Sequence, residues 1–183
     1  MPQQQYYDPI ILNDRKRKEN NVAVGREEIV ALLQEKGVSF DLAEHPPVYT
    51  IDEMLALKLP HPKDIAKNLF LRDDKKQNYY LIVLREDKKA DLKKIRSVLA
   101  ARPLRFASEE DLEAYLGVTT GAVTPFGLLN DRSHKVKACV DKDLKRGLVG
   151  VHPNENTATV YLQARALVEL LQEQGADIDF ESL

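Results

Sequence analysis

Two apolar runs on either side of a short polar segment restrict the fold of this chain more than any other feature of its sequence. The runs cover residues 67–71 and 79–84, and the segment between them reads Asp73-Asp74-Lys75-Lys76-Gln77-Asn78. Apolar runs of this length that are bounded by turn-forming residues are typical of paired strands. The pattern therefore predicts a β-hairpin with a polar loop.

Helices and strands alternate irregularly on both sides of this hairpin. Helical spacing of apolar residues, with capping and stop signals, predicts helices over about 26–36, from Thr50 to about 59, over about 92–99, from Ser108 to 117, and over about 164–174. Short apolar runs predict further strands at about 38–42, 104–106, 136–140, 148–151, 157–162 and 177–180, and residues 118–127 form a predicted loop. This order predicts an α/β (α+β mixed) fold in which helices surround a mixed central sheet of about seven strands.

The length of 183 residues predicts one domain, which we place at 25–183, preceded by a polar, flexible N-terminal arm at 1–24. The 27 basic and 29 acidic residues nearly balance, which argues against a dedicated duplex-DNA binder. No apolar run approaches the roughly 20 residues needed to span a membrane, and the first residues lack the apolar stretch of a signal peptide. We therefore expect a cytoplasmic protein without a membrane partner.

Most of the familiar catalytic motifs are missing from the sequence. It contains no phosphate-binding loop, dinucleotide-binding glycine motif, hydrolase nucleophile elbow or H-E-x-x-H zinc motif. His45, His61 and His152 each precede a proline and lack the spacing of metal ligands, so we expect no metal and no cofactor. The single Cys139 lies in an apolar strand and is interpreted as a buried structural thiol.

Several loop segments remain, and each has an ordinary structural explanation when it is taken alone. Residues 119–127 combine two glycines and a proline, as a simple connector does, although such a loop can also bring its N–H groups close to a bound group. The segment from His152 to Thr159 reads as a polar turn between strands, and Lys67 reads as a solvated lysine at the start of a strand.

Taken together, these segments resemble a known family. The order and spacing of the segments 44–50, 67–72, 104–108, 121–131 and 152–159 are similar to those of the YbaK/ProX family of aminoacyl-tRNA deacylases, from about residue 25 to the C-terminus. The branch that is most similar is the free-standing prolyl-tRNA editing branch. Two positions depart from the family pattern: Ala122 stands where serine is common, and Asp64-Ile65-Ala66 replaces a small, glycine-containing approach to Lys67.

The resemblance implies a YbaK-like fold with a curved central sheet, and hydrolysis of an amino acid wrongly esterified to tRNA(Pro), with no metal. It implies that the catalytic residues are Lys67, Gly121 and His152. The substrate-binding residues that it implies are His45, Pro47, Tyr49, Asn68, Val123, Thr124, Pro125, Val151 and Asn156. Candidate contacts to the tRNA backbone, for which a solvated surface is the ordinary alternative, are Lys89, Lys93, Arg96, Arg132, Lys135 and Lys137.

The role of each catalytic residue has alternatives. Lys67 can contact the 3′ end of the tRNA or polarise the ester carbonyl. His152 can act as a general base, or a substrate 2′-hydroxyl can position the water instead. A glycine-rich loop can stabilise the tetrahedral oxyanion through its N–H groups, which makes the Gly121 loop the candidate for this role.

The expected substrate is alanyl-tRNA(Pro), because a synthetase pocket built for proline rejects smaller amino acids by only about 1–3 kcal/mol. A second, smaller pocket would then admit alanine and exclude proline, and Val123, Val151 and His152 would set its size. Cysteinyl-tRNA(Pro) is an alternative substrate, and a non-catalytic module that binds aminoacyl-tRNA or prolyl-tRNA synthetase is an alternative class.

Overall fold

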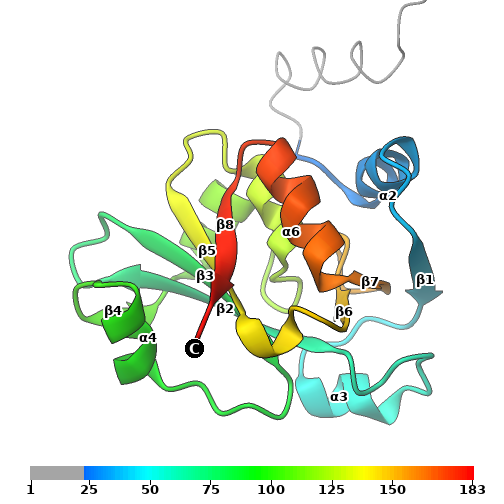
Figure 1. The fold of residues 1–183 in the computed structure, drawn as a ribbon, viewed down its shortest axis with the longest axis horizontal. Helices are drawn as coiled ribbons and strands as arrows, with labels where there is room; N and C mark the ends of the chain where they lie inside the picture. Colours follow the sequence, from blue (N-terminus) through cyan, green and yellow to red (C-terminus); the bar gives the residue numbers. More distant parts are fainter. Residues whose placement is uncertain (1–22) are drawn as a thin grey trace, which may run out of the picture.

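The computed structural model describes residues 23–183 (Figure 1), so the predicted N-terminal arm lies outside the described residues apart from its last two positions. Val24 is attached to the folded chain through two side chains. Its N–H donates to Asn130 Oδ1 at 2.6 Å, and its carbonyl accepts from Asn154 Nδ2 at 2.7 Å. Val24 is therefore held against the folded chain by its main-chain groups.

The predicted hairpin forms the centre of a five-stranded mixed sheet. Its strands are β2 (Ala66–Asp73) and β3 (Tyr79–Arg85), and the sheet order is β4-β2-β3-β5-β8. Strand β4 (Leu104–Phe106) is antiparallel to β2, whereas β5 (Val136–Asp141) and β8 (Asp177–Glu181) continue the sheet in parallel. The turn is held by the buried Asp73, whose carboxylate accepts from the N–H groups of Lys75 and Gln77 at 3.1 and 2.9 Å.

A second, antiparallel sheet has the order β1-β7-β6. It consists of β1 (Phe40–Glu44), β6 (Leu148–Val151) and β7 (Ala158–Gln163). The predicted α/β class is confirmed, but the eight strands of the described residues form two sheets instead of one sheet of about seven. The two sheets are distinct because, among the described residues, a single isolated parallel bridge joins them, between Ile65 and Gly150, and β2 and β6 diverge beyond it.

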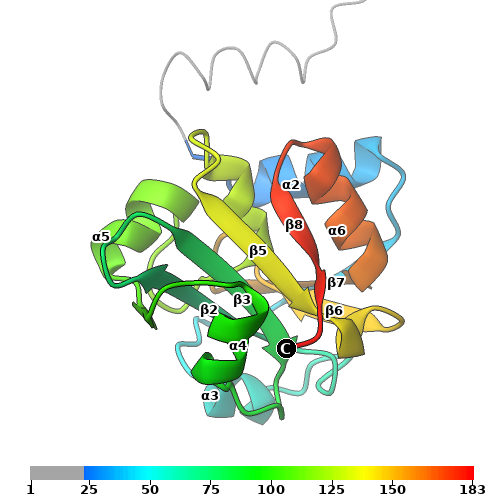
Figure 2. The same cartoon turned by 60° about the vertical axis from the view of Figure 1, so that its left-hand side comes forward.

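Helices cover these sheets from both sides. The main core lies between the two sheets and the helices α2 (Arg26–Glu35) and α6 (Ala164–Glu173). Helix α4 (Leu92–Val98) packs through Ile95 on the opposite face of the five-stranded sheet, as Figure 2 shows. Helix α3 (Ile51–Ala56) covers the outer face of the three-stranded sheet, where Met54 packs near Tyr161.

Two predicted segments differ in local geometry. Ser108 caps its helix as predicted, but α5 (Glu109–Asp111) passes into a π-helical turn, η1 (Leu112–Leu116), before Gly117 ends it in the left-handed region. The predicted loop at 118–127 contains the start of a 3-10 helix, η2 (Pro125–Asn130), because Pro125 presets the first helical position and Thr124 caps it. A second 3-10 turn, η3 (Lys142–Leu144), follows β5.

None of the helices in residues 23–183 combines the length and the apolar character that crossing a bilayer requires.

Candidate active site

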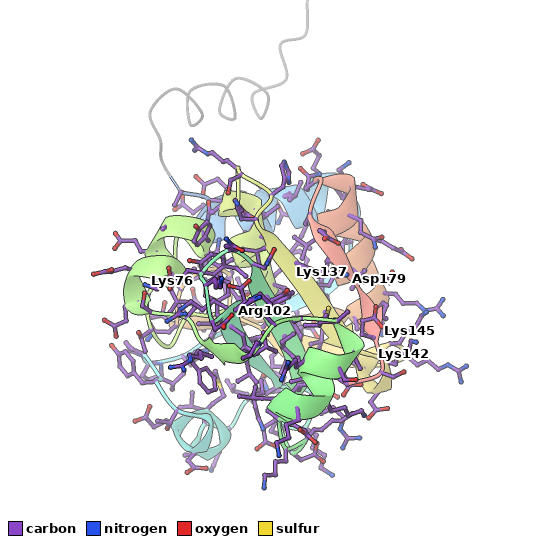
Figure 3. All side chains as sticks on the ribbon, turned by 90° about the vertical axis from the view of Figure 1, so that its left-hand side faces the viewer. Lys76, Arg102, Lys137, Lys142, Lys145 and Asp179 are labelled. Atoms are coloured by element: carbon purple, nitrogen blue, oxygen red, sulfur yellow. The ribbon has the colours of Figure 1, made fainter. Side chains whose placement is uncertain are left out.

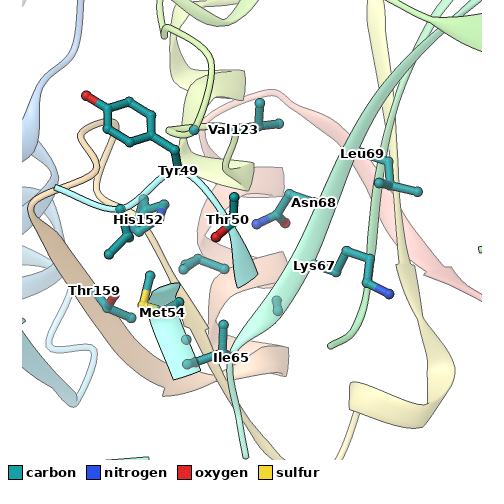
Figure 4. A pocket seen from close by; sticks show the side chains of 15 residues that line it. Tyr49, Thr50, Met54, Ile65, Lys67, Asn68, Leu69, Val123, His152 and Thr159 are labelled. Carbon is teal, nitrogen blue, oxygen red and sulfur yellow. The ribbon is translucent and has the colours of Figure 1, made fainter. Parts of the chain in front are cut away.

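A pocket of about 300 Å³ lies at the seam between the two sheets. The seam is closed on one side by the bridge from Ile65 to Gly150, where the Gly150 N–H donates to the Asp64 carbonyl at 2.7 Å. Beyond this point β2 and β6 diverge, and the space between them remains open to a ligand. The lining residues are Val48, Tyr49, Thr50, Met54, Ile65, Ala66, Lys67, Asn68, Leu69, Gly121, Val123, Gly150, Val151, His152 and Thr159 (Figure 4).

Strand β2 supplies one wall of the pocket. Because successive side chains of a strand alternate between faces, Lys67 and Asn68 point in opposite directions, and Figure 4 shows Asn68 directed toward Thr50 while Lys67 points away. The Oδ1 atom of Asn68 is buried and has no hydrogen-bond partner among the described residues. Asn68 therefore offers an unused polar atom on the wall where a ligand would lie.

The Lys67 ammonium lies at the margin of the pocket. Its Nζ donates to the Lys88 carbonyl at 2.8 Å. The Lys88 side chain is itself held by the buried Asp141 and by Asp143, the latter at 3.0 Å. The hydrogen bond from Lys67 Nζ to the Lys88 carbonyl therefore holds the positive charge of Lys67 beside the pocket and away from its centre.

The segment between β1 and β2 forms the rim of the pocket. Thr50 and Glu53 form the predicted capping box, in which the Glu53 N–H donates to Thr50 Oγ1 and the Thr50 N–H donates to Glu53 Oε2, both at 3.2 Å. The Tyr49 side chain is 66% exposed. It lies over Gly121, whose φ of +88° favours glycine and where an added Cβ would lie 3.0 Å from Tyr49 Cδ1. Any side chain at Gly121 would therefore displace the rim.

The loop that contains Gly121 supplies main-chain donors. The Ala122 N–H is used within the loop, where it donates to the Thr119 carbonyl at 3.0 Å. Within residues 23–183, no hydrogen bond uses the main-chain N–H of Gly121 or Val123, and both residues line the pocket. The hydroxyl of the fully buried Thr124 donates to the His152 carbonyl at 2.5 Å and so ties this loop to the end of β6.

His152 is held by its ring. The Nδ1 atom lies 2.8 Å from the Ala158 carbonyl, which can only accept, so Nδ1 carries the proton and Nε2 of the neutral ring has a free lone pair. Burial lowers the pKa of His152 from its usual 6.5, outweighing the hydrogen bond to Ala158, and a smaller contribution from His45 also lowers it. The ring is therefore an acceptor at neutral pH.

The structure brings many of the predicted site residues together. Those that line the pocket are Tyr49, Lys67, Asn68, Gly121, Val123, Val151 and His152, whereas His45, Pro47, Thr124, Pro125 and Asn156 lie outside its lining. Thr124 supports the wall from behind, and Asn156 Nδ2 anchors the rim by donating to the Val48 carbonyl at 3.2 Å. Thr159 and Gly150 line the pocket but were not predicted, because β6 and β7 form a hairpin whose place beside β2 depends on the distant bridge between Ile65 and Gly150.

The predicted contacts to tRNA fall into two separate regions. Lys89 follows Lys88, whose carbonyl accepts from Lys67, whereas Lys93 and Arg96 lie on α4. Arg132, Lys135 and Lys137 precede or begin β5, where Lys137 pairs in register with Tyr80 and Asp177, at the other end of the sheet. Figure 3 shows Lys137 on the same face as Asp179 of the acidic strand β8. Lys89 is thus connected through Lys88 to a residue that lines the pocket.

Cys139, a side chain with nucleophilic potential, does not line the pocket. Cys139 is completely buried, as predicted, and burial raises the pKa of its thiol to about 12. Among residues 23–183, no three His, Cys, Asp or Glu side chains are grouped so that they could hold a metal ion.

Comparisons with known proteins agree on one family. The family model described as the Aminoacyl-tRNA editing domain matches residues 45–170. The chain is 43% identical to the prolyl-tRNA editing protein ProX of Acetoanaerobium sticklandii, over 82% of this chain and 92% of that protein. It is 34% identical to the prolyl-tRNA synthetase associated domain-containing protein 1 of Danio rerio, over 81% and 82% of the two chains.

A solved structure of a candidate trans-editing enzyme for prolyl-tRNA synthetase has the same fold. It superposes with a TM-score of 0.62, covers 87% of this chain and 97% of its own, and shares 21% sequence identity.

Proposed function

This chain belongs to the aminoacyl-tRNA editing domain family, and from that premise we propose that it acts in trans to hydrolyse the ester of alanine wrongly attached to tRNA(Pro). One observation carries the proposal. Every residue that lines the pocket lies between Val48 and Thr159, inside the segment that matches the family model. The pocket is thus built from the part of the chain that defines the family.

The pocket offers the groups that ester hydrolysis needs. Attack of water on the ester carbonyl produces a tetrahedral oxyanion, and the unused N–H groups of Gly121 and Val123 are donors suited to it. The free lone pair of His152 Nε2 can take the proton of the attacking water. Removal of one such donor reduces transition-state stabilisation by roughly 2.7–4 kcal/mol in characterised enzymes. Two main-chain donors in this loop would therefore contribute a large part of the rate enhancement.

The pocket is suited to a small acyl group. Its volume of about 300 Å³ lies at the lower end of the usual range of ligand pockets, roughly 300–1,000 Å³. Val123, Val151 and Met54 contribute apolar lining. We infer that this pocket admits alanine and excludes proline, and so removes what a proline-specific synthetase pocket cannot reject strongly enough.

We further propose that Lys67 contacts the 3′ end of the tRNA. Its ammonium lies at the margin of the pocket and is a compact charge suited to a phosphate or ribose of the tRNA 3′ end that leaves the pocket there. The lysines beside β3 would then meet the adjoining backbone phosphates. Prolyl-tRNA synthetase is a proposed partner, because it produces the mischarged substrate.

The test follows the loss of ester from alanyl-, cysteinyl- and prolyl-tRNA(Pro) in parallel, with and without a chelator. We expect rapid loss of alanine alone, unaffected by the chelator, and a large loss of rate in Lys67→Ala. Lys142→Ala, which removes an exposed lysine of η3, is the matched control and should behave as wild type.

Each other result has a definite meaning. Preferential loss of cysteine would change the substrate within the family. Inhibition by the chelator that zinc reverses would overturn the metal-free mechanism. Binding of the three tRNAs without loss of any ester would refute hydrolysis and favour a non-catalytic binding module.

A further inference from the structure

Three polar side chains lie on or directly after neighbouring strands, and two of them, Thr159 and His152, line the pocket. Thr159 belongs to β7, His152 follows β6, and His45 follows β1, and β7 lies between the other two strands in the sheet. Thr159 is 1% exposed and lines the pocket together with His152. The two imidazole centroids are 5.8 Å apart.

The hydrogen bonds of His45 determine where the Thr159 proton points. His45 Nδ1 lies 2.9 Å from the Pro46 carbonyl, which can only accept, so Nδ1 carries the proton of the neutral ring. His45 Nε2 is therefore an acceptor, and the Thr159 hydroxyl, 2.9 Å away, donates its proton to it. With its proton used in this way, Thr159 Oγ1 has only lone pairs to offer to the pocket.

The pocket thus contains two acceptors at the same end, Thr159 Oγ1 and His152 Nε2. Thr159 is hydrogen-bonded to His45, whose ring centroid lies 5.8 Å from that of His152, so the two acceptors belong to one neighbourhood. A water molecule that donates to two acceptors at ordinary hydrogen-bond lengths separates them by roughly 4.5 Å, so both acceptors must line the same small space, as Thr159 and His152 do. Water also fits chemically, because it has two O–H donors and keeps a lone pair for attack, whereas a ribose hydroxyl has a single donor.

We propose that Thr159 and His152 bind the attacking water, and that His45 is a positioning residue that orients the Thr159 hydroxyl. This inference rests on the proposed deacylase function. The water donates a hydrogen bond through one O–H to Thr159 Oγ1 and keeps that proton, while its other proton passes to His152 Nε2 as its oxygen bonds to the ester carbonyl carbon. The carbonyl electron pair moves to the oxyanion, which then collapses and expels the ribose 3′ oxygen. That oxygen takes the proton back from His152, so free alanine and an intact tRNA end result.

The experiment compares Thr159→Val, which removes the hydroxyl and keeps the shape, with Thr159→Ser, which keeps the hydroxyl. For Thr159→Val we expect kcat on alanyl-tRNA(Pro) to fall roughly 10- to 100-fold, because the nucleophile is no longer held in line. Thr159→Ser should recover most of that loss. Thr157→Val is the matched control, because the Thr157 hydroxyl donates to Glu155 outside the pocket lining, at 2.8 Å.

Two further measurements test whether Thr159 holds the attacking water, contacts the substrate or only supports the fold. Affinity for a non-hydrolysable, amide-linked alanyl-tRNA(Pro) should be unchanged in Thr159→Val, because the hydroxyl contacts water and not the acyl group. His45→Met should lower kcat by a similar factor, and the double variant His45→Met/Thr159→Val should be no slower than Thr159→Val alone, since both changes remove one arrangement.

The outcomes also distinguish this inference from the proposed function. Wild-type protein without deacylase activity would refute the function and the inference with it. An active wild type with an undiminished Thr159→Val variant would refute the inference alone. Weakened binding of the amide analogue in Thr159→Val, or fully additive losses in the double variant, would overturn the water site in favour of direct substrate contact or of independent structural roles.

Discussion

Replacement of Gly150 by alanine should destabilise the protein because the ring of Tyr161 occupies the position of the added methyl group. A Cβ at Gly150 would lie 2.5 Å from Tyr161 Cε1 and 2.8 Å from Cδ1, both far inside van der Waals contact. Tyr161 is 1% exposed and packs with Val48, Met54 and Ile65, so the ring has no empty space to enter. Overpacking of this kind costs about 1–3 kcal/mol, and two ring atoms this close place Gly150→Ala near 3 kcal/mol.

Thermal unfolding measures this cost directly. For a chain of this size, a loss of about 3 kcal/mol should lower Tm by roughly 6–12 °C. Gly147→Ala is the matched control, since its nearest neighbour would be the Leu144 carbonyl at 3.8 Å, and we expect a change within about 0.5 kcal/mol. Tyr161→Leu in the Gly150→Ala background should recover part of the loss. Equal Tm values for the two alanine variants would refute the steric explanation.

Two other predictions follow from the site. If His152 acts as the base, kcat/KM for alanyl-tRNA(Pro) should stay level as pH falls through 6.5 and decline only below it, because burial lowers the pKa of His152; a midpoint at or above 6.5 would contradict this assignment. Thr124→Val should cost about 1–2 kcal/mol in chemical denaturation because it leaves the His152 carbonyl without its donor, and an unchanged free energy of unfolding would show that this bond is unimportant.

Features determined by neighbouring residues could be predicted from the sequence. The hairpin of β2 and β3 and the capping box of Thr50 and Glu53 depend on residues close together in the chain, and both form as predicted. The strand predicted at 38–42 instead forms at 40–44, because its bounds are set by pairing with β7 and not by its own alternation. The division into two sheets depends on where β2 and β6 separate, which no local pattern records.

The candidate site shows the same distinction. Lys67, Gly121 and His152 can be predicted from the sequence because they belong to recognisable segments, and all three line one pocket. The direction of the Lys67 ammonium, toward the Lys88 carbonyl, could not be read from the sequence. Thr159 could not be predicted for a related reason, since its significance comes from a partner 114 residues earlier, His45.

The pairing of β1 with β7 also has a consequence for the order in which the protein becomes active during its synthesis. The pocket combines the rim near Val48 with Thr159 on β7, and β1 has no strand partner among the described residues until β7 has been made. Strands this far apart in the sequence pair late in folding, because the chain between them must be ordered first. A chain that stops before β7 would therefore lack one end of the pocket, so incomplete products of translation should be unable to strip amino acids from the tRNA that is supplying the ribosome.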